Sequence, residues 1–115
     1  MGTTQDAGSK AEDEAQRYLI ENGLVARQRN YRCRGGEIDL VMRDGDCLVF
    51  IEVRYRRRSG FGGALASIDA RKQRRVIHAA QHYLARHNWQ GPCRFDVIAF
   101  DGDAPQQWIR DAFGT

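Results

Sequence analysis

The chain has 115 residues, of which 42% are apolar, and 18 basic against 15 acidic residues give a formal net charge of +3. This length corresponds to one domain and allows about two-thirds of the unfolded surface to be buried without disulfides or a structural metal. The longest apolar runs, residues 48–51 and 97–100, are far shorter than a membrane span, and the first residues lack an export-signal pattern. We therefore expect one soluble, cytoplasmic domain over residues 1–115, with residues 1–6 disordered.

The cysteine pattern favours a reducing compartment. Cys33, Cys47 and Cys93 are odd in number, have no C-x-x-C spacing and fall in segments that resemble strands. A disulfide framework needs paired cysteines, and a zinc site needs closely spaced ligands. We therefore expect three reduced thiols that take no part in the chemistry.

Positive charge is concentrated in one part of the chain. Sixteen of the 18 basic residues are arginine, a side chain suited to bidentate contacts with phosphate. Residues 54–75 contain a single acid, Asp69, and eight basic residues, namely Arg54, Arg56, Arg57, Arg58, Arg71, Lys72, Arg74 and Arg75. A smaller cluster consists of Arg27, Arg29, Arg32 and Arg34. This asymmetry is typical of a face that binds nucleic acid, and a solvated charged surface is the alternative.

The first half of the chain predicts one helix and three strands. Residues 7–22 carry apolar side chains at helical spacing and are followed by Gly23, a typical residue just past a helix. Residues 24–34 mix polar and apolar side chains in a strand-like way, and residues 36–43 alternate between them. A hairpin signal, Asp44-Gly45-Asp46, then leads to residues 47–54, whose nearly continuous apolar character predicts a strand covered on both faces.

The second half predicts a helix over residues 67–87 and strands over residues 94–100 and 106–113. The apolar stripe of this helix consists of Val76, Ile77, Ala80, Tyr83 and Leu84. The opposite face carries Arg71, Arg74, Arg75, His78 and His82. Lys72, however, falls on the core side and points toward whatever the helix covers. We therefore predict a single α/β domain with a mixed, mostly antiparallel sheet flanked by helices.

The hairpin brings carboxylates together. A turn centred on Asp44-Gly45 pairs Met42 with Cys47, which places Leu40 opposite Val49 and Ile38 opposite Ile51, so every pair on that face is apolar. On the other face the same register places three acidic side chains, Glu37, Asp39 and Glu52, on one patch of the sheet, with Glu37 opposite Glu52 and Asp39 opposite Phe50.

Carboxylates that repel each other in a partly buried place need compensation. A divalent cation between Asp39 and Glu52 would provide it, and Mg²⁺ binds through one or two carboxylates together with substrate phosphate. Such an ion neutralises charge at a scissile phosphate and lowers the pKa of an attacking water. Arg54 points to the same face. The alternative is a solvated acidic face neutralised by nearby arginines, although Leu48 and Phe50 on that face indicate that it is covered.

These residues carry a resemblance. Glu37-Ile38-Asp39-Leu40, followed by residues 50–56, resembles the D…(D/E)-x-K signature of restriction-endonuclease-like nucleases, with Holliday-junction resolvases close in pattern. Nearly the whole chain resembles the YraN-like family of small bacterial proteins, which is assigned to that nuclease fold. The further matching stretches are 10–13 with 18–19, 29–32, 35–40, 49–56, 69–72 and 94–97. The resemblance implies a restriction-endonuclease-like αβββαβ core.

The resemblance also implies a metal held by Asp39 and Glu52, with Glu12 of the first helix as a third ligand and Glu37 nearby. A capping box formed by Ser9 and Glu12 is an equal alternative for Glu12. Arg54 stands where these nucleases usually have Lys. Because arginine stays protonated it cannot act as a general base, but it can orient water or stabilise negative charge. Lys72 is the candidate to take over the lysine role.

Two weaker signals point to the same partner. His78 and His82 have the i, i+4 spacing of helical zinc ligands, but no third ligand is evident, which favours contact with solvent or phosphate. The glycine-rich residues 59–63 would let backbone amides approach a phosphate while Phe61 stacks on a base, with a plain connector as the alternative.

The sequence therefore predicts an Mg²⁺- or Mn²⁺-dependent nuclease that acts on DNA, with branched or other non-B structures as candidate substrates. Six arginines would grip the phosphate backbone: Arg56, Arg57, Arg58, Arg71, Arg74 and Arg75. The alternatives are a catalytically inactive nucleic-acid-binding module with the same fold and an RNA- or ribosome-associated adaptor. Arg54 in place of Lys favours these alternatives, whereas the complete carboxylate set favours the enzyme. Related nucleases often pair, so a homodimer stays open.

Overall fold

A computed structural model shows the fold, and it describes residues 4–56, 68–102 and 105–114. In chain order the elements are α1 (Thr4–Glu21), β1 (Val25–Cys33), β2 (Gly36–Asp44), β3 (Cys47–Arg56), α3 (Ala70–Arg86), β4 (Cys93–Asp101) and β5 (Gln107–Phe113). The described strands form one five-stranded sheet in the order β1-β2-β3-β4-β5. Every pair of neighbours is antiparallel except β3 and β4, which are parallel and are joined through α3. The predicted mixed α/β class is confirmed, and the element order is consistent with a restriction-endonuclease-like core.

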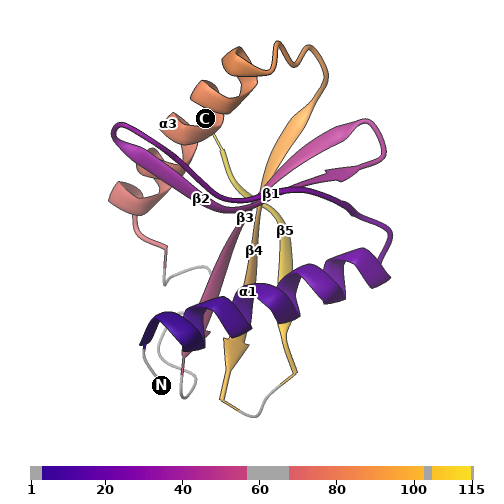
Figure 1. Ribbon diagram of the computed structural model, residues 1–115, viewed down its shortest axis with the longest axis vertical. Coiled ribbons are helices and arrows are strands. Elements are labelled where there is room, and N and C mark those ends of the chain that lie inside the picture. Colours follow the sequence, from indigo (N-terminus) through magenta and orange to yellow (C-terminus); the bar gives the residue numbers. More distant parts are fainter. Residues whose placement is uncertain (1–3, 57–67, 103–104, 115) are drawn as a thin grey trace.

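The two helices cover opposite faces of the sheet (Figure 1). Helix α1 contributes Ala11, Ala15 and Leu19 to a core on one face, where they meet β2, β3 and β4. Helix α3 contributes Val76, Ala79, Ala80 and Tyr83 to a core on the other face. This arrangement explains why β3 is apolar on both sides, as its sequence predicts. Among the described residues, no helix has the length and apolar character needed to cross a membrane.

Helix α1 is longer at its start than the sequence pattern indicates. It begins at Thr4, so three of the six residues expected to be disordered are helical. It ends as predicted: Gly23 has a φ of +97°, the Leu24 amide donates to the Leu19 carbonyl, and the Gly23 amide donates to the Ile20 carbonyl. This is the Schellman arrangement, in which a glycine takes the left-handed position and an apolar residue follows it.

The predicted hairpin register is wrong by two residues. Met42 pairs with Val49 and Asp44 with Cys47, so the turn residues are Gly45 and Asp46. Gly45 has a φ of +61°, a conformation that favours glycine in two-residue hairpin turns. A shift of two residues keeps every side chain on its face, so the apolar pattern could not distinguish the two registers. The predicted opposition of Glu37 to Glu52 and of Asp39 to Phe50 is therefore wrong, because Phe50 pairs with Val41.

The alternation of β2 is interrupted at Asp39. Leu40 and Met42 join the core beneath α1, whereas Ile38 joins the core beneath α3, so the predicted common face of these three residues is wrong at Ile38. The partner strand bends at the same level, where Asn30 has a φ of +53° between the pairs Arg29–Leu40 and Tyr31–Ile38. A left-handed residue inside a strand changes the direction of the chain. The bend lies where the candidate site begins.

Candidate functional site

Asp39 and Glu52 are joined by reciprocal hydrogen bonds to backbone. The backbone pairing of β2 with β3 ends at Leu40–Ile51. One residue further, hydrogen bonds between side chains and backbone take the place of the backbone–backbone hydrogen bonds. The Asp39 amide donates to Glu52 Oε2 over 3.1 Å, and the Val53 amide donates to Asp39 Oδ2 over 2.9 Å. Each carboxylate thus uses one oxygen to hold the opposite strand. The two acids lie side by side because the observed register, extended by one residue beyond Leu40–Ile51, places Asp39 opposite Glu52.

Burial sets the electrostatics of this pair. Glu52 is fully buried, and its burial, reinforced by the nearby Asp39, raises its pKa to about 8. Burial likewise raises the pKa of Asp39, although the hydrogen bond from the Val53 amide and the charge of Lys72 act in the opposite direction. Glu12 and Glu37 raise the pKa of Asp39 further. Negative charge therefore accumulates around the buried pair, and a cation at this place would lower the pKa values of Asp39 and Glu52.

Lys72 reaches the buried pair from the first turn of α3. Its Nζ lies 3.3 Å from Glu52 Oε1 and 3.9 Å from Glu37 Oε1. Glu52 Oε1 is buried and makes no hydrogen bond, so its contact with Lys72 is an ion pair without hydrogen-bond geometry. The core-side position that the sequence predicts for Lys72 thus brings it to the carboxylates. Glu37 and Glu52 therefore share Lys72 as an ion-pair partner, although they are not paired across the strands.

Two local features hold Lys72 in this place. Asp69 is the N-cap of α3, and its side chain accepts a hydrogen bond of 2.8 Å from the Lys72 amide. Gly36, at the start of β2, lies so close to α3 that an added Cβ would be 2.3 Å from the Arg75 carbonyl oxygen. Because glycine has no side chain, the helix can approach the strand that carries Glu37 and Asp39.

Glu12 lies inside α1 rather than at its start. Since the helix begins at Thr4, the alternative of a Ser9–Glu12 capping box is wrong. Glu12 Oε1 accepts hydrogen bonds of 3.2 Å from both Arg29 and Asn30 of β1, and Arg29 also pairs with Asp13. Sequence reasoning missed Arg29 and Asn30 as partners of Glu12. The available signal was Asn30 itself, since asparagine tolerates the left-handed conformation at the bend.

Arg54 follows Glu52 by two residues on β3. It pairs with Ala99 of β4 and is half-buried. Its predicted role beside the carboxylates stays a prediction. A permanently charged guanidinium here can stabilise negative charge but cannot take up a proton.

The donor set around Asp39 and Glu52 suits a cation held by two carboxylates. Across the described ranges, no three His, Cys, Asp or Glu side chains converge closely enough to hold a metal ion by themselves, and the role of Glu12 as a third ligand stays a prediction. Mg²⁺ does not need such a cage, because it keeps several waters and binds through one or two carboxylates and substrate phosphates. The unsatisfied Glu52 Oε1 is a buried oxygen that such an ion would satisfy.

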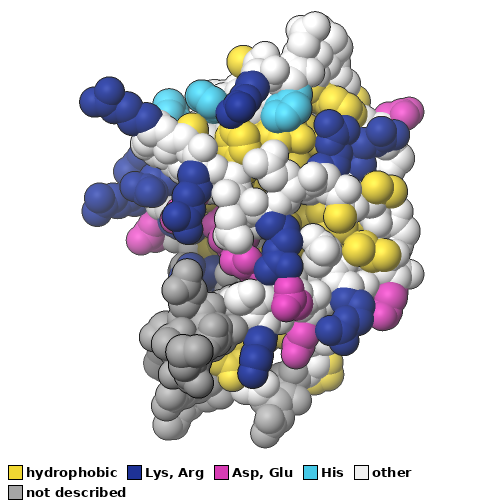
Figure 2. Space-filling model, in the orientation of Figure 1, with side chains coloured by type: hydrophobic (Ala, Val, Ile, Leu, Met, Phe, Trp, Pro, Cys, Tyr) yellow, Lys and Arg dark blue, Asp and Glu magenta, His cyan; other side chains and the backbone are white. Residues whose placement is uncertain are grey.

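The predicted phosphate-gripping arginines are described only in part. Arg71, Arg74 and Arg75 are exposed on α3, whereas Arg57, Arg58 and the glycine-rich residues 59–63 lie outside the described residues, as does the side chain of Arg56. Figure 2 shows Lys and Arg side chains projecting from the side of the molecule where α3 and the β1–β2 hairpin lie. On that hairpin, Arg32 and Arg34 are also exposed.

The two histidines of α3 contact β1 and its turn. A His78 ring nitrogen lies 2.9 Å from the Arg34 carbonyl oxygen, and His82 Nδ1 hydrogen-bonds with the Tyr31 hydroxyl. Each histidine therefore has a protein partner, and among the described side chains no third zinc ligand accompanies them. They fix α3 against the hairpin.

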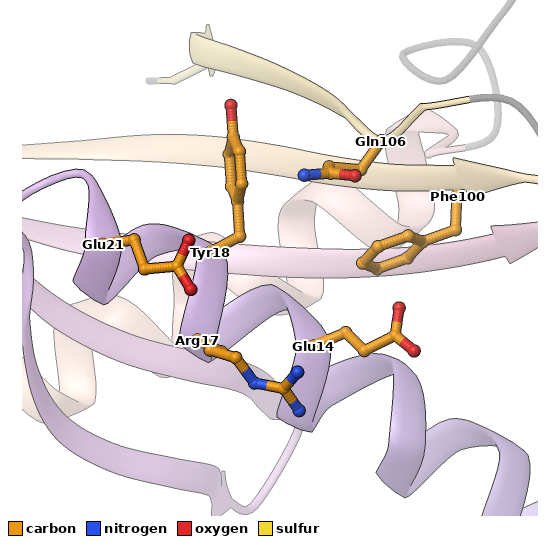
Figure 3. Close-up of a pocket in the computed structure, with 6 residues that line it drawn as sticks. All are labelled: Glu14, Arg17, Tyr18, Glu21, Phe100 and Gln106. Carbon is orange, nitrogen blue, oxygen red and sulfur yellow. The ribbon is translucent and has the colours of Figure 1, made fainter.

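A separate pocket lies between α1, the end of β4 and the residue that precedes β5 (Figure 3). Its lining residues are Glu14, Arg17, Tyr18, Glu21, Phe100 and Gln106. None of the predicted site residues lines it. The candidate site is therefore the place where the backbone pairing of β2 with β3 ends, beneath the start of α3.

Fold and site together define a class: a small α/β domain of restriction-endonuclease-like element order, with a buried acidic pair opposed by a helix lysine. A model of the uncharacterised protein family UPF0102 matches residues 11–100, and the chain belongs to this family. A UPF0102 protein of Janthinobacterium sp. (strain Marseille) is 56% identical over 94% of this chain and 87% of its own length. One from Pseudomonas putida (strain W619) is 52% identical over 93% and 92%. One from Cupriavidus metallidurans is 56% identical over 96% and 83%.

Proposed function

We propose that this protein is a metal-dependent nuclease that hydrolyses phosphodiester bonds in DNA, branched or other non-B structures included. One observation carries the proposal: the fully buried Glu52 keeps an oxygen without a hydrogen bond, beside Asp39 and 3.3 Å from Lys72. A buried carboxylate without its full set of hydrogen bonds destabilises the fold. Proteins keep such groups mainly at functional sites. The resemblance of the sequence to restriction-endonuclease-like nucleases supports the same interpretation.

Each residue of the candidate site has a separate role in the proposed reaction. Asp39 and Glu52 hold the cation, and their backbone hydrogen bonds fix both carboxylates before substrate arrives. The bound Mg²⁺ or Mn²⁺ would neutralise charge on the scissile phosphate and lower the pKa of the water that displaces the leaving oxygen. Lys72 and Arg54 stabilise the negative charge that develops on the phosphate. Exposed arginines of α3 contact the flanking phosphates without reading sequence.

A cleavage assay tests the proposal. Duplex, single-stranded, flap and four-way-junction DNAs, together with an RNA control, are incubated with the protein and Mg²⁺ or Mn²⁺. We expect cleavage by the wild type and loss of cleavage in Asp39→Ala and Glu52→Gln. Glu21→Gln on α1, an exposed glutamate away from the pair, is the matched control and should cleave normally. No cleavage by the wild type on any substrate, or undiminished cleavage in both site variants, would exclude the enzyme.

One observation favours a second candidate, a nucleic-acid-binding module that has lost cleavage. Lys72 already lies against Glu52, and Arg54 stands where a general-base lysine would be expected, so the site has a built-in positive charge. This candidate predicts that DNA or RNA binds, that binding weakens steeply as salt concentration rises, and that no substrate is cut. Exchanging Arg71, Arg74 and Arg75 together for Ala should weaken binding in either case.

A further inference from the structure

Lys72 lies between two carboxylates of very different exposure. Its Nζ is 3.3 Å from Glu52 Oε1, in the buried pair, and 3.9 Å from Glu37 Oε1. The Glu52 side chain is 1% exposed, whereas that of Glu37 is 38% exposed and also pairs with Arg32 over 3.5 Å. The lysine therefore has one partner inside the protein and one at its surface, both within reach of a side chain whose backbone is held by the Asp69 cap.

The inner contact is a loose one. Charge-assisted hydrogen bonds between ammonium and carboxylate groups are typically about 2.7–2.9 Å long. The contact of Lys72 with Glu52 Oε1 is longer and lacks hydrogen-bond geometry, which leaves that oxygen unsatisfied. Lys72 therefore supplies charge to the buried carboxylate through an ion pair that is longer than a charge-assisted hydrogen bond.

A divalent cation and the Lys72 ammonium would compete for the same oxygen. An ion bound through Asp39 and Glu52 would place two positive charges next to Nζ, and the two cations would repel in a setting with little water. The lysine has a flexible stem and can turn without movement of the helix. Glu37 is the other carboxylate in contact with it among the described residues, and it lies on the same strand as Asp39.

We propose that Lys72 is a displaceable counterion of Glu52, which a cation entering the Asp39–Glu52 pair moves onto Glu37. This inference rests on the proposed function, since it requires a metal at that pair. It makes Glu37 a positioning residue: Glu37 holds Lys72 at the edge of the site, where the ammonium faces phosphate, and does not bind the metal.

Calorimetric titration with Mn²⁺, without nucleic acid, tests the displacement. Lys72→Met keeps the length of the side chain and removes its charge, and it should bind Mn²⁺ about tenfold more tightly, equivalent to ~1.4 kcal/mol, because no ammonium has to move. Glu37→Gln should bind Mn²⁺ about threefold more weakly, because the displaced lysine loses its second partner. Arg86→Met is the matched control: it removes an exposed charge in the last turn of α3, and screening by salt should leave its affinity within about twofold of the wild type.

The outcomes separate the two proposals. If the wild type binds Mn²⁺, Asp39→Ala abolishes binding, and Lys72→Met binds no more tightly than Arg86→Met, the displacement is overturned while the metal site stands. If neither the wild type nor Lys72→Met binds Mn²⁺, both proposals fail. Binding by Lys72→Met alone would support displacement in its strongest form. Should Lys72→Met not fold without metal, Glu37→Gln decides, since unchanged or tighter binding by that variant overturns the inference.

Discussion

Two buried acids on neighbouring strands differ in how many hydrogen bonds their carboxylates accept. Glu52 of β3 and Asp96 of β4 are both completely buried, and they lie one register position apart, since Ile51 pairs with Asp96. Asp96 accepts hydrogen bonds from Arg94 Nε, from Trp108 Nε1 over 2.9 Å and from the Asp111 amide over 2.9 Å. Among the described residues, Glu52 Oε2 accepts a hydrogen bond from the Asp39 amide, whereas Oε1 accepts none and lies 3.3 Å from Lys72 Nζ.

The difference separates a carboxylate that the fold satisfies from the carboxylate of the candidate site. The partners of Asp96 come from β4 and β5, and Arg94 also pairs with Asp44 over 2.9 Å, so this group ties the edge strand and the β2–β3 hairpin to the sheet. A fully satisfied buried charge serves the fold. Glu52 is buried to the same degree, but among the described residues its Oε1 has an ion pair with Lys72 and no hydrogen bond.

The largest effect should come from removing the structural acid. Asp96→Ala leaves the Arg94 charge, the indole and the Asp111 amide without their acceptor, and breaking a buried pair in this way costs about 3–5 kcal/mol of unfolding free energy. Denaturant unfolding would measure it. Asp46→Ala, an exposed acid in the hairpin turn, is the control and should change stability by less than about 0.5 kcal/mol. A small loss in Asp96→Ala would remove the contrast with Glu52.

The second effect concerns pH. Because the pKa of Glu52 is raised to about 8, the folded protein retains a proton that the unfolded chain releases above its ordinary value of 4.5. The free energy of unfolding of the metal-free protein should therefore fall as pH rises from about 4.5 to 8, by about 1.4 kcal/mol for each unit of pKa displacement. Glu52→Gln should flatten this dependence, and Mn²⁺ should reduce it in the wild type. A wild-type stability that rises over this range would contradict the assignment.

A third variant tests the close packing of α3 against Gly36 of β2. Gly36→Ala would place a methyl group against the Arg75 carbonyl, and such overpacking typically costs about 1–3 kcal/mol. It should also displace Lys72 from Glu52, so Mn²⁺ affinity should change along with thermal stability. Gly114→Ala, where an added Cβ meets open space, is the matched control. Equal melting temperatures for the two variants would show that the close approach does not hold the helix.

The smallest effect should come from the cap of α3. Asp69→Ala removes the hydrogen bond to the Lys72 amide and should cost about 1 kcal/mol, whereas Asp69→Ser keeps a capping oxygen and should retain most of the stability. Thermal unfolding compares the two variants. If Asp69→Ser is as unstable as Asp69→Ala, the loss comes from the charge rather than from the cap.

Much of the fold could be read from the pattern of apolar residues. The glycine C-cap of α1, the two faces of β3 and the core side of Lys72 follow from periodicity, which depends only on local geometry. The hairpin register did not follow, because a shift of two residues satisfies the same pattern. The bend at Asn30 and Asp39 was also missed, since strict alternation assumes a regular strand. The reciprocal hydrogen bonds of the buried acids arise at that irregularity.

The sequence by itself determined which residues could carry chemistry: Asp39, Glu52, Glu37, Arg54 and Lys72 all emerge from spacing, charge and resemblance. Apolar patterning alone does not distinguish the hydrogen bonding of Asp96 from that of Glu52, since both are acids within apolar strands. Only the tertiary structure decided that Asp96 is satisfied and Glu52 is not, because hydrogen-bond partners come from segments distant in the chain and depend on how strands and helices meet. Burial combined with an unmet hydrogen bond is a property of the folded molecule, and it marks the candidate site.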